Sequence, residues 1–308
     1  MHDKFLVRRG AGDHAEAVLT GSANLTIPGL CVQANVLHAF ESPSLAALYL
    51  ARQHLLATDP TLKNTAAANT GWSAPIALAG GQARVFFPPE PKTERVSLDT
   101  IVNAVRAADS SVIFCCFTPT DLPILNACFE AGDEGRMMFG LVNSVDLPSP
   151  GDVSYASKIE LYHRSQDNRD VMGKGGFTGA LTPLGFLQEP GSVPFADPFG
   201  VRIHHKFVLI DAETDTPVLY TGSANLSNNS AHQNDENLLE IVGSPQLAHA
   251  YLAEFLRLYE HYRARLFFER FKSGDFETFK LTPNASWAKK YYTPDSPEAR
   301  ARVAMASG

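Results

Sequence analysis

The feature that most constrains the fold of this chain is an internal duplication. Residues 35–51 align without gaps to residues 237–253 at an offset of 202, and nine of the 17 positions are identical. Two shorter blocks repeat in the same order: Gly21-Ser22-x-Asn24 matches Gly222-Ser223-x-Asn225, and His2-x-Lys4-Phe5 matches His204-x-Lys206-Phe207. Blocks that keep their order along the chain indicate a duplicated structural unit.

Each copy has the pattern of three strands followed by a helix. Runs rich in Val, Ile, Leu and Phe are typical of strands, and Ser-Pro before a helical apolar spacing is typical of a helix start. The expected strands cover 2–8, 17–20 and 35–40 in the first copy and 202–210, 217–221 and 237–242 in the second, with helices beginning at Ser42-Pro43 and Ser244-Pro245. The intervening chain alternates strands (83–87, 112–117, 137–142) with helices (98–108, 123–131), which is typical of a mostly parallel sheet covered by helices.

The duplication also sets the expected domain boundaries. We expect the end of a first repeat plus a linker in 1–73, a complete second repeat in 74–265 and a C-terminal extension in 266–308, with the linker itself at 65–71 and a long irregular insertion at 146–199. The second copy has over a hundred residues ahead of its His-x-Lys element and the first has one. We therefore expect the first repeat to be N-terminally truncated and the chain to be a fragment, so localisation, cytoplasmic or secreted, stays open.

Composition narrows the class of protein. With 44% hydrophobic residues and a formal net charge of −7, the chain has the profile of a globular protein rather than a disordered one. No apolar run approaches the roughly 18 residues that a transmembrane helix needs. The acidic balance weighs mildly against a protein that coats nucleic acid through bulk positive charge, although a partial chain weakens that argument.

The repeated polar residues suit a reaction at phosphorus. On a strand, His204 and Lys206 share one face while His205 points to the other. A neutral imidazole beside an ammonium group suits an anionic target, and the Gly-Ser-x-Asn element adds hydroxyl and amide donors for phosphate oxygens. In-line displacement at a phosphodiester needs a nucleophile on one side and an acid on the other, which one histidine from each copy would supply. No histidine spacing typical of a metal site is present, and no cofactor is expected.

These residues resemble the HKD signature of the phospholipase D superfamily. The resemblance is carried by His204-x-Lys206-x4-Asp211 with Gly222-Ser223-x-Asn225, and by His2-x-Lys4 with Gly21-Ser22-x-Asn24. It implies a duplicated α-β-α sandwich with mixed, mostly parallel sheets, and a metal-independent phosphodiesterase that forms a phosphohistidine intermediate. The implied site residues are His2, Lys4, His204 and Lys206 for catalysis, Ser22, Asn24, Ser223 and Asn225 for phosphate binding, and Gly21, Gly222, Asp211 and Glu240 in support.

Two positions depart from a symmetric site. The position matching Asp211 is Arg9 in the first copy, and by strand parity Asp211 should point toward the scaffold, so we expect Arg9 to remove a structural contact only. Glu240 is expected to accept a hydrogen bond from His204, and its counterpart in the first copy is His38. The better supported His204 would then be the nucleophile and His2 the acid.

Three functions remain open at this point. The leading hypothesis is a phospholipase D that hydrolyses a phospholipid phosphodiester, with transient contact at a membrane surface. The second is a nuclease that uses the same chemistry on DNA or RNA, and the third is a non-catalytic relative that binds phosphate ligands. Arg9 and His38 are the features that keep the third hypothesis open.

Overall fold

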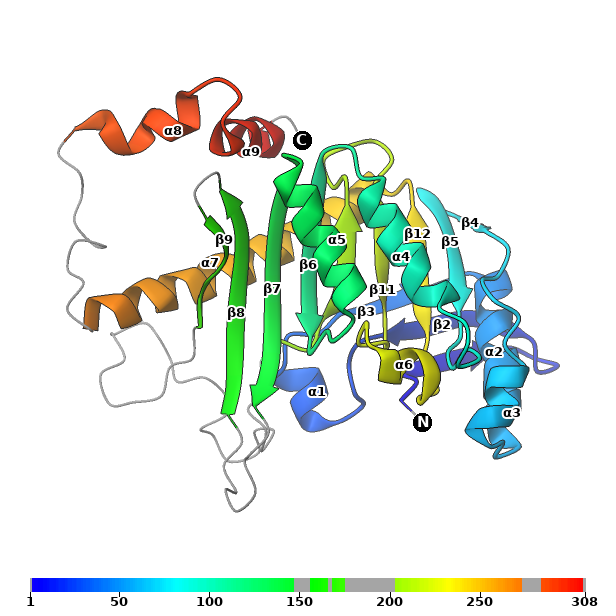
Figure 1. Cartoon of the computed structure of the whole chain (residues 1–308). Helices are drawn as coiled ribbons and strands as arrows, with labels where there is room; N and C mark the ends of the chain where they lie inside the picture. The colour runs from blue at the N-terminus through cyan, green and yellow to red at the C-terminus, as the bar shows by residue number, and fades with distance from the viewer. Residues whose placement is uncertain (1, 147–155, 166–167, 175–202, 273–283, 307–308) are drawn as a thin grey trace, which may run out of the picture.

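The computed structural model describes residues 2–146, 156–165, 168–174, 203–272 and 284–306. Its largest element is a nine-stranded sheet with the strand order β4-β5-β12-β11-β10-β6-β7-β8-β9 (Figure 1). The bounds are β4 Ile76–Leu78, β5 Gly81–Phe86, β6 Ser111–Phe117, β7 Met137–Asp146, β8 Ala156–Ser165, β9 Asn168–Lys174, β10 Lys206–Ile210, β11 Val218–Gly222 and β12 Leu238–Val242.

The sheet is mixed, as expected, but it is not mostly parallel. Within the described part of the chain only β6 and β7 pair in parallel, and every other neighbouring pair is antiparallel. The parallel pair is the one whose strands are joined by a full crossover helix, α5, Leu122–Asp133. Short turns such as the one between β10 and β11 return the chain beside the preceding strand, which makes the pairing antiparallel.

Helices cover both faces of this sheet, which makes an α-β-α sandwich (Figure 1). On one face α4, Val96–Arg106, and α5 pack on a core that includes Phe114 and Cys116 of β6. On the other face α7, Pro245–Lys272, packs through Tyr251 and Phe255 on a core that includes Cys115. Adjacent residues of a strand point to opposite faces, and the two cysteines obey that rule.

The first copy forms a smaller, three-stranded antiparallel sheet of β1 Phe5–Arg9, β2 Ala15–Gly21 and β3 Leu37–Phe40, with helices α1 Ile27–Cys31, α2 Pro43–Ala57 and α3 Leu62–Ala67. As predicted, α2 begins at Ser42-Pro43, where the Ser42 hydroxyl accepts a hydrogen bond from the backbone N–H of Leu45. Val18 and Tyr49 of this copy pack in one core with Val85 and Leu239 of the large sheet. The two repeats therefore share a hydrophobic interface.

Two expectations about connecting segments need correction. The linker expected at 65–71 begins inside a helix, because α3 extends to Ala67 and its N-cap Thr61 accepts from the N–H of Asn64. The insertion expected to be irregular at 146–199 contains β8 and β9, which continue the sheet, while 147–155, 166–167 and 175–199 lie outside the described residues. In 158–161 the polar Lys158 and Glu160 alternate with the buried Ile159 and Leu161, which is the period of a strand.

Near the C-terminal end, the short helices η3 Ala285–Ala288 and α8 Lys289–Tyr292 precede α9 Pro297–Ala306, which lies against β7 and β8. None of the helices in the described ranges is long and apolar enough to cross a membrane.

Candidate active site

The two His-x-Lys elements lie at the starts of equivalent strands and have the same local geometry. His2 and Lys4 precede β1, and Lys206 is the first residue of β10, so both strands begin slightly later than expected. In each copy the lysine Nζ donates to the carbonyl oxygen of the histidine two residues earlier, at 2.6 Å for Lys4 and 2.8 Å for Lys206. His205 packs on the opposite side, edge-on against Phe207, as its parity predicts.

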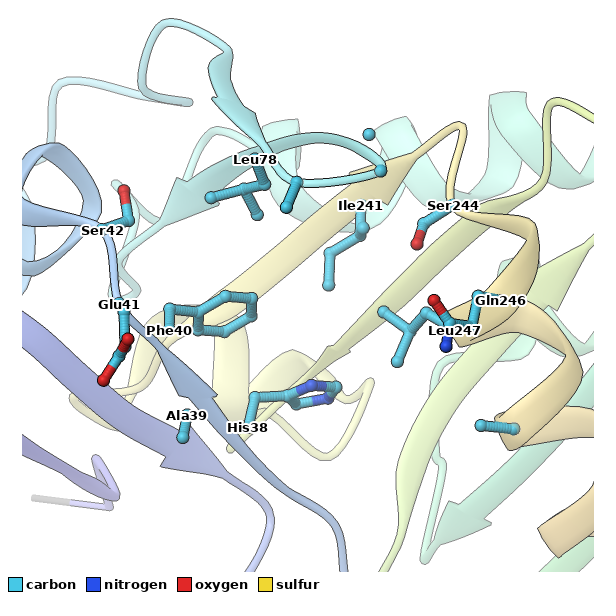
Figure 2. A pocket seen from close by; sticks show the side chains of 14 residues that line it. His38, Ala39, Phe40, Glu41, Ser42, Leu78, Ile241, Ser244, Gln246 and Leu247 are labelled. Atoms are coloured by element: carbon cyan, nitrogen blue, oxygen red, sulfur yellow. The ribbon is translucent and has the colours of Figure 1, made fainter.

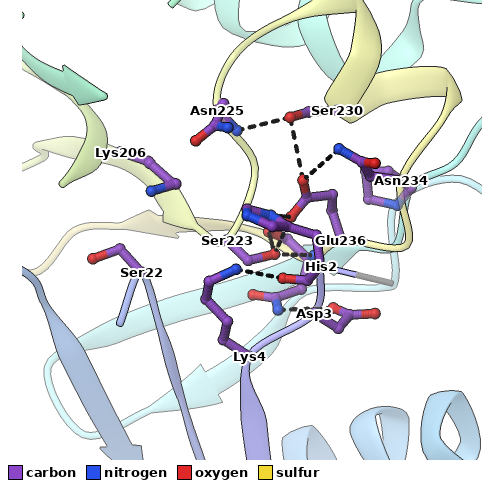
Figure 3. Close-up of polar contacts among 12 residues, drawn as sticks. His2, Asp3, Lys4, Ser22, Lys206, Ser223, Asn225, Ser230, Asn234 and Glu236 are labelled. Atoms are coloured by element: carbon purple, nitrogen blue, oxygen red, sulfur yellow. Dashed lines mark hydrogen bonds and ion pairs between the residues drawn. The ribbon is translucent and has the colours of Figure 1, made fainter. Parts of the chain in front are cut away.

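The backbone carbonyl groups and the side chains that hold each histidine come from the other repeat. The backbone N–H of His2 donates to the carbonyl oxygen of Asp235 at 2.9 Å, and its Nδ1 lies 2.7 Å from Oε2 of Glu236 (Figure 3). The second oxygen of Glu236 accepts from Ser230 Oγ at 3.2 Å and Asn234 Nδ2 at 3.4 Å. Glu236 is fully buried, and its carboxylate fixes the orientation of the His2 ring.

His204 is held in the same way but by an amide. Its backbone N–H donates to the carbonyl oxygen of Ala34 at 2.8 Å, and its Nδ1 lies 2.9 Å from Asn35 Oδ1 and 3.0 Å from the Ser22 carbonyl oxygen. Asn35 Nδ2 donates to the Gly29 carbonyl oxygen at 2.8 Å, which fixes the amide oxygen toward the imidazole. These two acceptors favour the tautomer with its proton on Nδ1 over the one that would accept from Lys206 Nζ, 3.2 Å away, and the favoured tautomer leaves Nε2 with a free lone pair.

The expected contact between Glu240 and His204 is wrong. Glu240 instead accepts a hydrogen bond from Nη2 of Arg84 at 2.8 Å and one from the Tyr220 hydroxyl at 2.6 Å. His38, its supposed counterpart, contacts the Tyr251 hydroxyl through Nε2 at 2.6 Å.

A one-residue shift in the offset between the two copies explains why Glu240 was matched to His38. Leu37 pairs with Gly21 in the first sheet, and Leu238 pairs with Gly222 in the second, so the structural offset on these strands is 201 rather than 202. At the correct offset Glu236 corresponds to Asn35. A slip of one residue pairs side chains from opposite faces of the two strands, which is why the gapless alignment matched Glu240 to His38.

Each Gly-Ser element lets two neighbouring strands of its own repeat approach closely, and its serine supports the residue that orients a histidine. A Cβ atom at Gly21 or Gly222 would overlap the carbonyl oxygen of Val36 or Asn237, so only glycine fits. Ser22 Oγ donates to Asn35 Oδ1 at 2.9 Å, and Ser223 Oγ donates to Glu236 Oε2 at 2.6 Å. Because both hydroxyls are fully buried and already donate, these serines serve the orienting residues, contrary to the expected role in phosphate binding.

Asn24 and Asn225 remain the candidate neutral donors for phosphate oxygens. Both are half-buried, and each lies two residues after the serine of its Gly-Ser element. Asn225 Oδ1 is buried with no hydrogen-bond partner among the described residues.

Asp211 is a scaffold residue, as predicted from its parity. Its carboxylate accepts from the backbone N–H groups of Asp109 at 3.0 Å, Ser110 at 2.8 Å and Ser111 at 3.1 Å. The counterpart Arg9 pairs with Asp13 at the protein surface. The exchange of Asp for Arg in the first copy therefore leaves the site itself unchanged.

Burial and like charge lower the pKa values of the basic groups. Burial, reinforced by Lys206 and Lys4, lowers the pKa of His204 to about 2. Burial lowers the pKa of Lys4 to about 8, and burial together with Lys4 holds the pKa of Lys206 well below its usual range. Burial thus disfavours the protonated form of both lysines. A bound anion would stabilise their positive charge.

A half-open cavity of about 590 Å3 lies away from these residues, between the far ends of β3 and β12 (Figure 2). Its walls include Phe40, Leu78, Ile241 and Leu247, with His38 at one side. Neither candidate catalytic histidine lines it. Among the described residues no three His, Cys, Asp or Glu side chains come together to hold a metal ion.

The sequence prediction missed Glu236, which directly precedes a predicted strand, and Asn35, which is the first residue of one. The run Asp235-Glu236-Asn237 was the available signal, because acidic residues that immediately precede a buried strand lie at the edge of the sheet where the His-x-Lys strand also begins.

Comparison with known proteins gives the class of this molecule. A family model described as "Cardiolipin synthase, PLD-like domain" matches residues 101–259, which is about half of the chain. The chain belongs to this PLD-like family, within the phospholipase D superfamily of phosphodiesterases. No curated protein sequence matches the chain.

Two solved structures are weakly similar. One is described as a phospholipase D family member, Nuc from Salmonella typhimurium, with 17% identity, a TM-score of 0.32, and coverage of 59% of this chain and 92% of that chain. The other is NucT from Helicobacter pylori, with 14% identity, a TM-score of 0.34, and coverage of 58% and 95%.

Proposed function

We propose that this protein hydrolyses a phospholipid phosphodiester in two steps through a phosphohistidine on His204, without a metal ion. The observation that carries the proposal is the unequal support of the two histidines across the repeat junction. His2 has a buried carboxylate at Nδ1, and His204 has an amide oxygen. One ring is therefore suited to carry a proton and the other to carry a lone pair.

The first step forms the covalent intermediate. His204 Nε2 attacks phosphorus, the P–N bond forms, and the P–O bond to the leaving group breaks. The leaving oxygen takes the proton from His2 Nε2, while Glu236 keeps the ring oriented. Lys4 and Lys206 hold the non-bridging oxygens, and their attraction to the anion offsets the cost of their burial.

The second step releases the product. Water attacks phosphorus as His2, now neutral, takes a proton from it. The P–N bond breaks, and the phosphomonoester leaves with His204 neutral again. Protons and charges return to their starting state, so no external reactant other than water is required.

The assignment of roles rests on protonation. An acid must carry its proton before the reaction, and the pKa of about 2 leaves His204 neutral at any physiological pH. A neutral imidazole with its proton on Nδ1 is a competent nucleophile. Acid-free quenching of a reaction and mass spectrometry should find the phosphoryl group on His204; finding it on His2 would reverse the assignment.

Phospholipid is the proposed substrate because the description of the matching family model names cardiolipin synthase, cardiolipin being a phospholipid, and because the net charge of −7 does not favour a polyanion. The test measures turnover of bis(4-nitrophenyl) phosphate, phosphatidylcholine or phosphatidylglycerol vesicles, and single-stranded DNA by wild type and His204→Ala. We expect vesicle hydrolysis that His204→Ala abolishes. Cleavage of DNA alone would make the protein a nuclease, and no turnover of any substrate would make it a phosphate-binding relative.

A further inference from the structure

Arg52 of α2 is a buried arginine that connects the helix of the first repeat to both sides of the candidate site. Its side chain is only 4% exposed. Its Nε donates to Asp3 Oδ2 at 3.2 Å. Its Nη2 donates to Asp235 Oδ1 at 3.1 Å and to the Pro88 carbonyl oxygen at 2.5 Å. The guanidinium also lies over the ring of Phe87, 5.6 Å from its centroid.

The two carboxylates that Arg52 binds are neighbours of the His2 and Glu236 pair. Asp3 is the middle residue of the first His-x-Lys element, and its side chain points away from the site by parity. Asp235 directly precedes Glu236, and its carbonyl oxygen accepts the backbone N–H of His2. Arg52 therefore fixes the backbone on either side of the hydrogen bond that orients His2.

A third contact closes this network. Asn237 Nδ2 donates to Asp3 Oδ1 at 2.9 Å, and Asn237 Oδ1 accepts from Thr20 Oγ1 at 3.1 Å. Asp3 thus receives donors from both repeats, and both of its oxygens are occupied. Burial raises the pKa of Asp3, while the charge of Arg52 and the hydrogen bonds from Asn237 and Arg52 oppose that shift.

The second repeat has a histidine and a carboxylate at the two equivalent positions. At the offset of 202 that relates the His-x-Lys elements and the long helices, Asp3 corresponds to His205 and Arg52 to Glu254. His205 Nε2 lies 3.6 Å from Glu254 Oε1, and His205 is 2% exposed. In both repeats, then, the middle residue of His-x-Lys lies against a charged residue of the long helix of its own repeat. Only Arg52 also reaches the other repeat.

We propose that Arg52 is a positioning residue that sets the geometry of His2 and Glu236 across the repeat junction, through Asp3 and Asp235. The proposal rests on the proposed phosphodiesterase function. A guanidinium can hold two carboxylates and a carbonyl oxygen at once in a fixed plane, whereas a lysine ammonium has no such fork. An arginine is therefore required and a positive charge alone is insufficient.

The test compares Arg52→Lys with wild type on bis(4-nitrophenyl) phosphate. We expect kcat to fall about tenfold to a hundredfold, because a misplacement of about 1 Å at a reacting group costs that much, while KM changes less than about twofold. Arg84→Lys is the matched control, since Arg84 also binds a carboxylate across strands but lies away from the site. It should keep kcat within about twofold of wild type.

A second readout does not depend on turnover. The Nδ1–H proton of His2 should give a downfield NMR signal in wild type, from its hydrogen bond to Glu236, and this signal should weaken or move upfield in Arg52→Lys but not in Arg84→Lys. If wild type hydrolyses nothing, the proposed function fails while this signal still tests the role of Arg52. Asp3→Asn, which keeps the side-chain shape, should act in the same direction if Arg52→Lys does not fold.

Three results would overturn the inference. One is an Arg52→Lys protein with wild-type kcat and an unchanged His2 signal. Another is an equal loss in Arg84→Lys, which would indicate a general effect on stability. The last is a rise in KM with kcat unchanged, which would place Arg52 in substrate binding rather than in the positioning of His2.

Discussion

Glu236 of the second repeat lies 2.7 Å from the ring of His2 in the first repeat, and its structural counterpart in the first repeat is Asn35, which lies 2.9 Å from His204. The two halves of the junction are thus built on one plan but differ in charge at the residue that orients each imidazole. That difference separates the proposed roles of the histidines, since a carboxylate favours a protonated ring and an amide a neutral one.

Replacing the carboxylate should therefore impair catalysis. We expect Glu236→Gln to lower kcat on bis(4-nitrophenyl) phosphate about a hundredfold, because the neutral amide no longer stabilises a positive His2 ring. Glu240→Gln is the control, since the partners of Glu240 among the described residues are Arg84 and Tyr220, away from both histidines. It should retain activity within about twofold. Equal losses in both variants would show that the assignment of Glu236 is wrong.

Anion binding should take up protons through Lys4. Burial lowers the pKa of Lys4 to about 8, and a bound sulfate would raise it again. At pH 8 this group should take up about half a proton on binding, and at pH 6, where it is already protonated, none. Calorimetry in buffers of different ionisation enthalpy measures the uptake. Lys4→Arg should bind sulfate without the proton uptake that Lys4 contributes. Identical proton uptake by the two proteins at pH 8 would contradict the prediction.

His38 should make the fold sensitive to acid. It is stacked between Phe40 and Tyr251, and burial lowers its pKa to about 4. Below the ordinary value of about 6.5 the unfolded chain binds a proton that the folded protein does not, so stability falls as the pH falls from about 6.5 to 4, by about 3 kcal/mol from this group.

The check is urea unfolding of wild type and His38→Leu at several pH values. Leucine occupies the structurally equivalent position, Leu239, in the second repeat. The difference in free energy of unfolding between pH 7 and pH 4 should be smaller in the variant by that amount. Parallel pH curves would mean that His38 is not the group responsible.

Asp211 should matter for stability and not for chemistry. Asp211→Ala leaves three backbone N–H groups without their acceptor and places alanine at a φ of 52°, which we expect to cost about 3 kcal/mol. Asp211→Asn keeps an acceptor oxygen and tolerates this backbone, so its cost should be about 1 kcal/mol. Urea unfolding measures both. A loss of kcat with unchanged stability would place Asp211 in the site after all.

Much of the architecture follows from local signals. The duplication, the alternation of strands and helices, the Ser42 cap and the parity of His205 and Asp211 each depend on a few neighbouring residues, because side chains alternate along a strand and caps satisfy nearby N–H groups. The direction of strand pairing does not, since it depends on which strands lie side by side. The sheet is therefore α/β as predicted, yet antiparallel in most of its pairs.

The sequence by itself determined that two His-x-Lys elements meet in one site, because only a repeated unit explains three blocks in matched order. Which residues orient the histidines was decided by the tertiary structure. Glu236 and Asn35 act across the repeat junction, and the offset between the copies changes from 202 at the His-x-Lys elements to 201 at β3 and β12. A gapless alignment cannot register that shift, and on a strand one residue of error exchanges the two faces. The role of Arg52 also depends on the tertiary structure, since its two carboxylates become neighbours only when the repeats pack together.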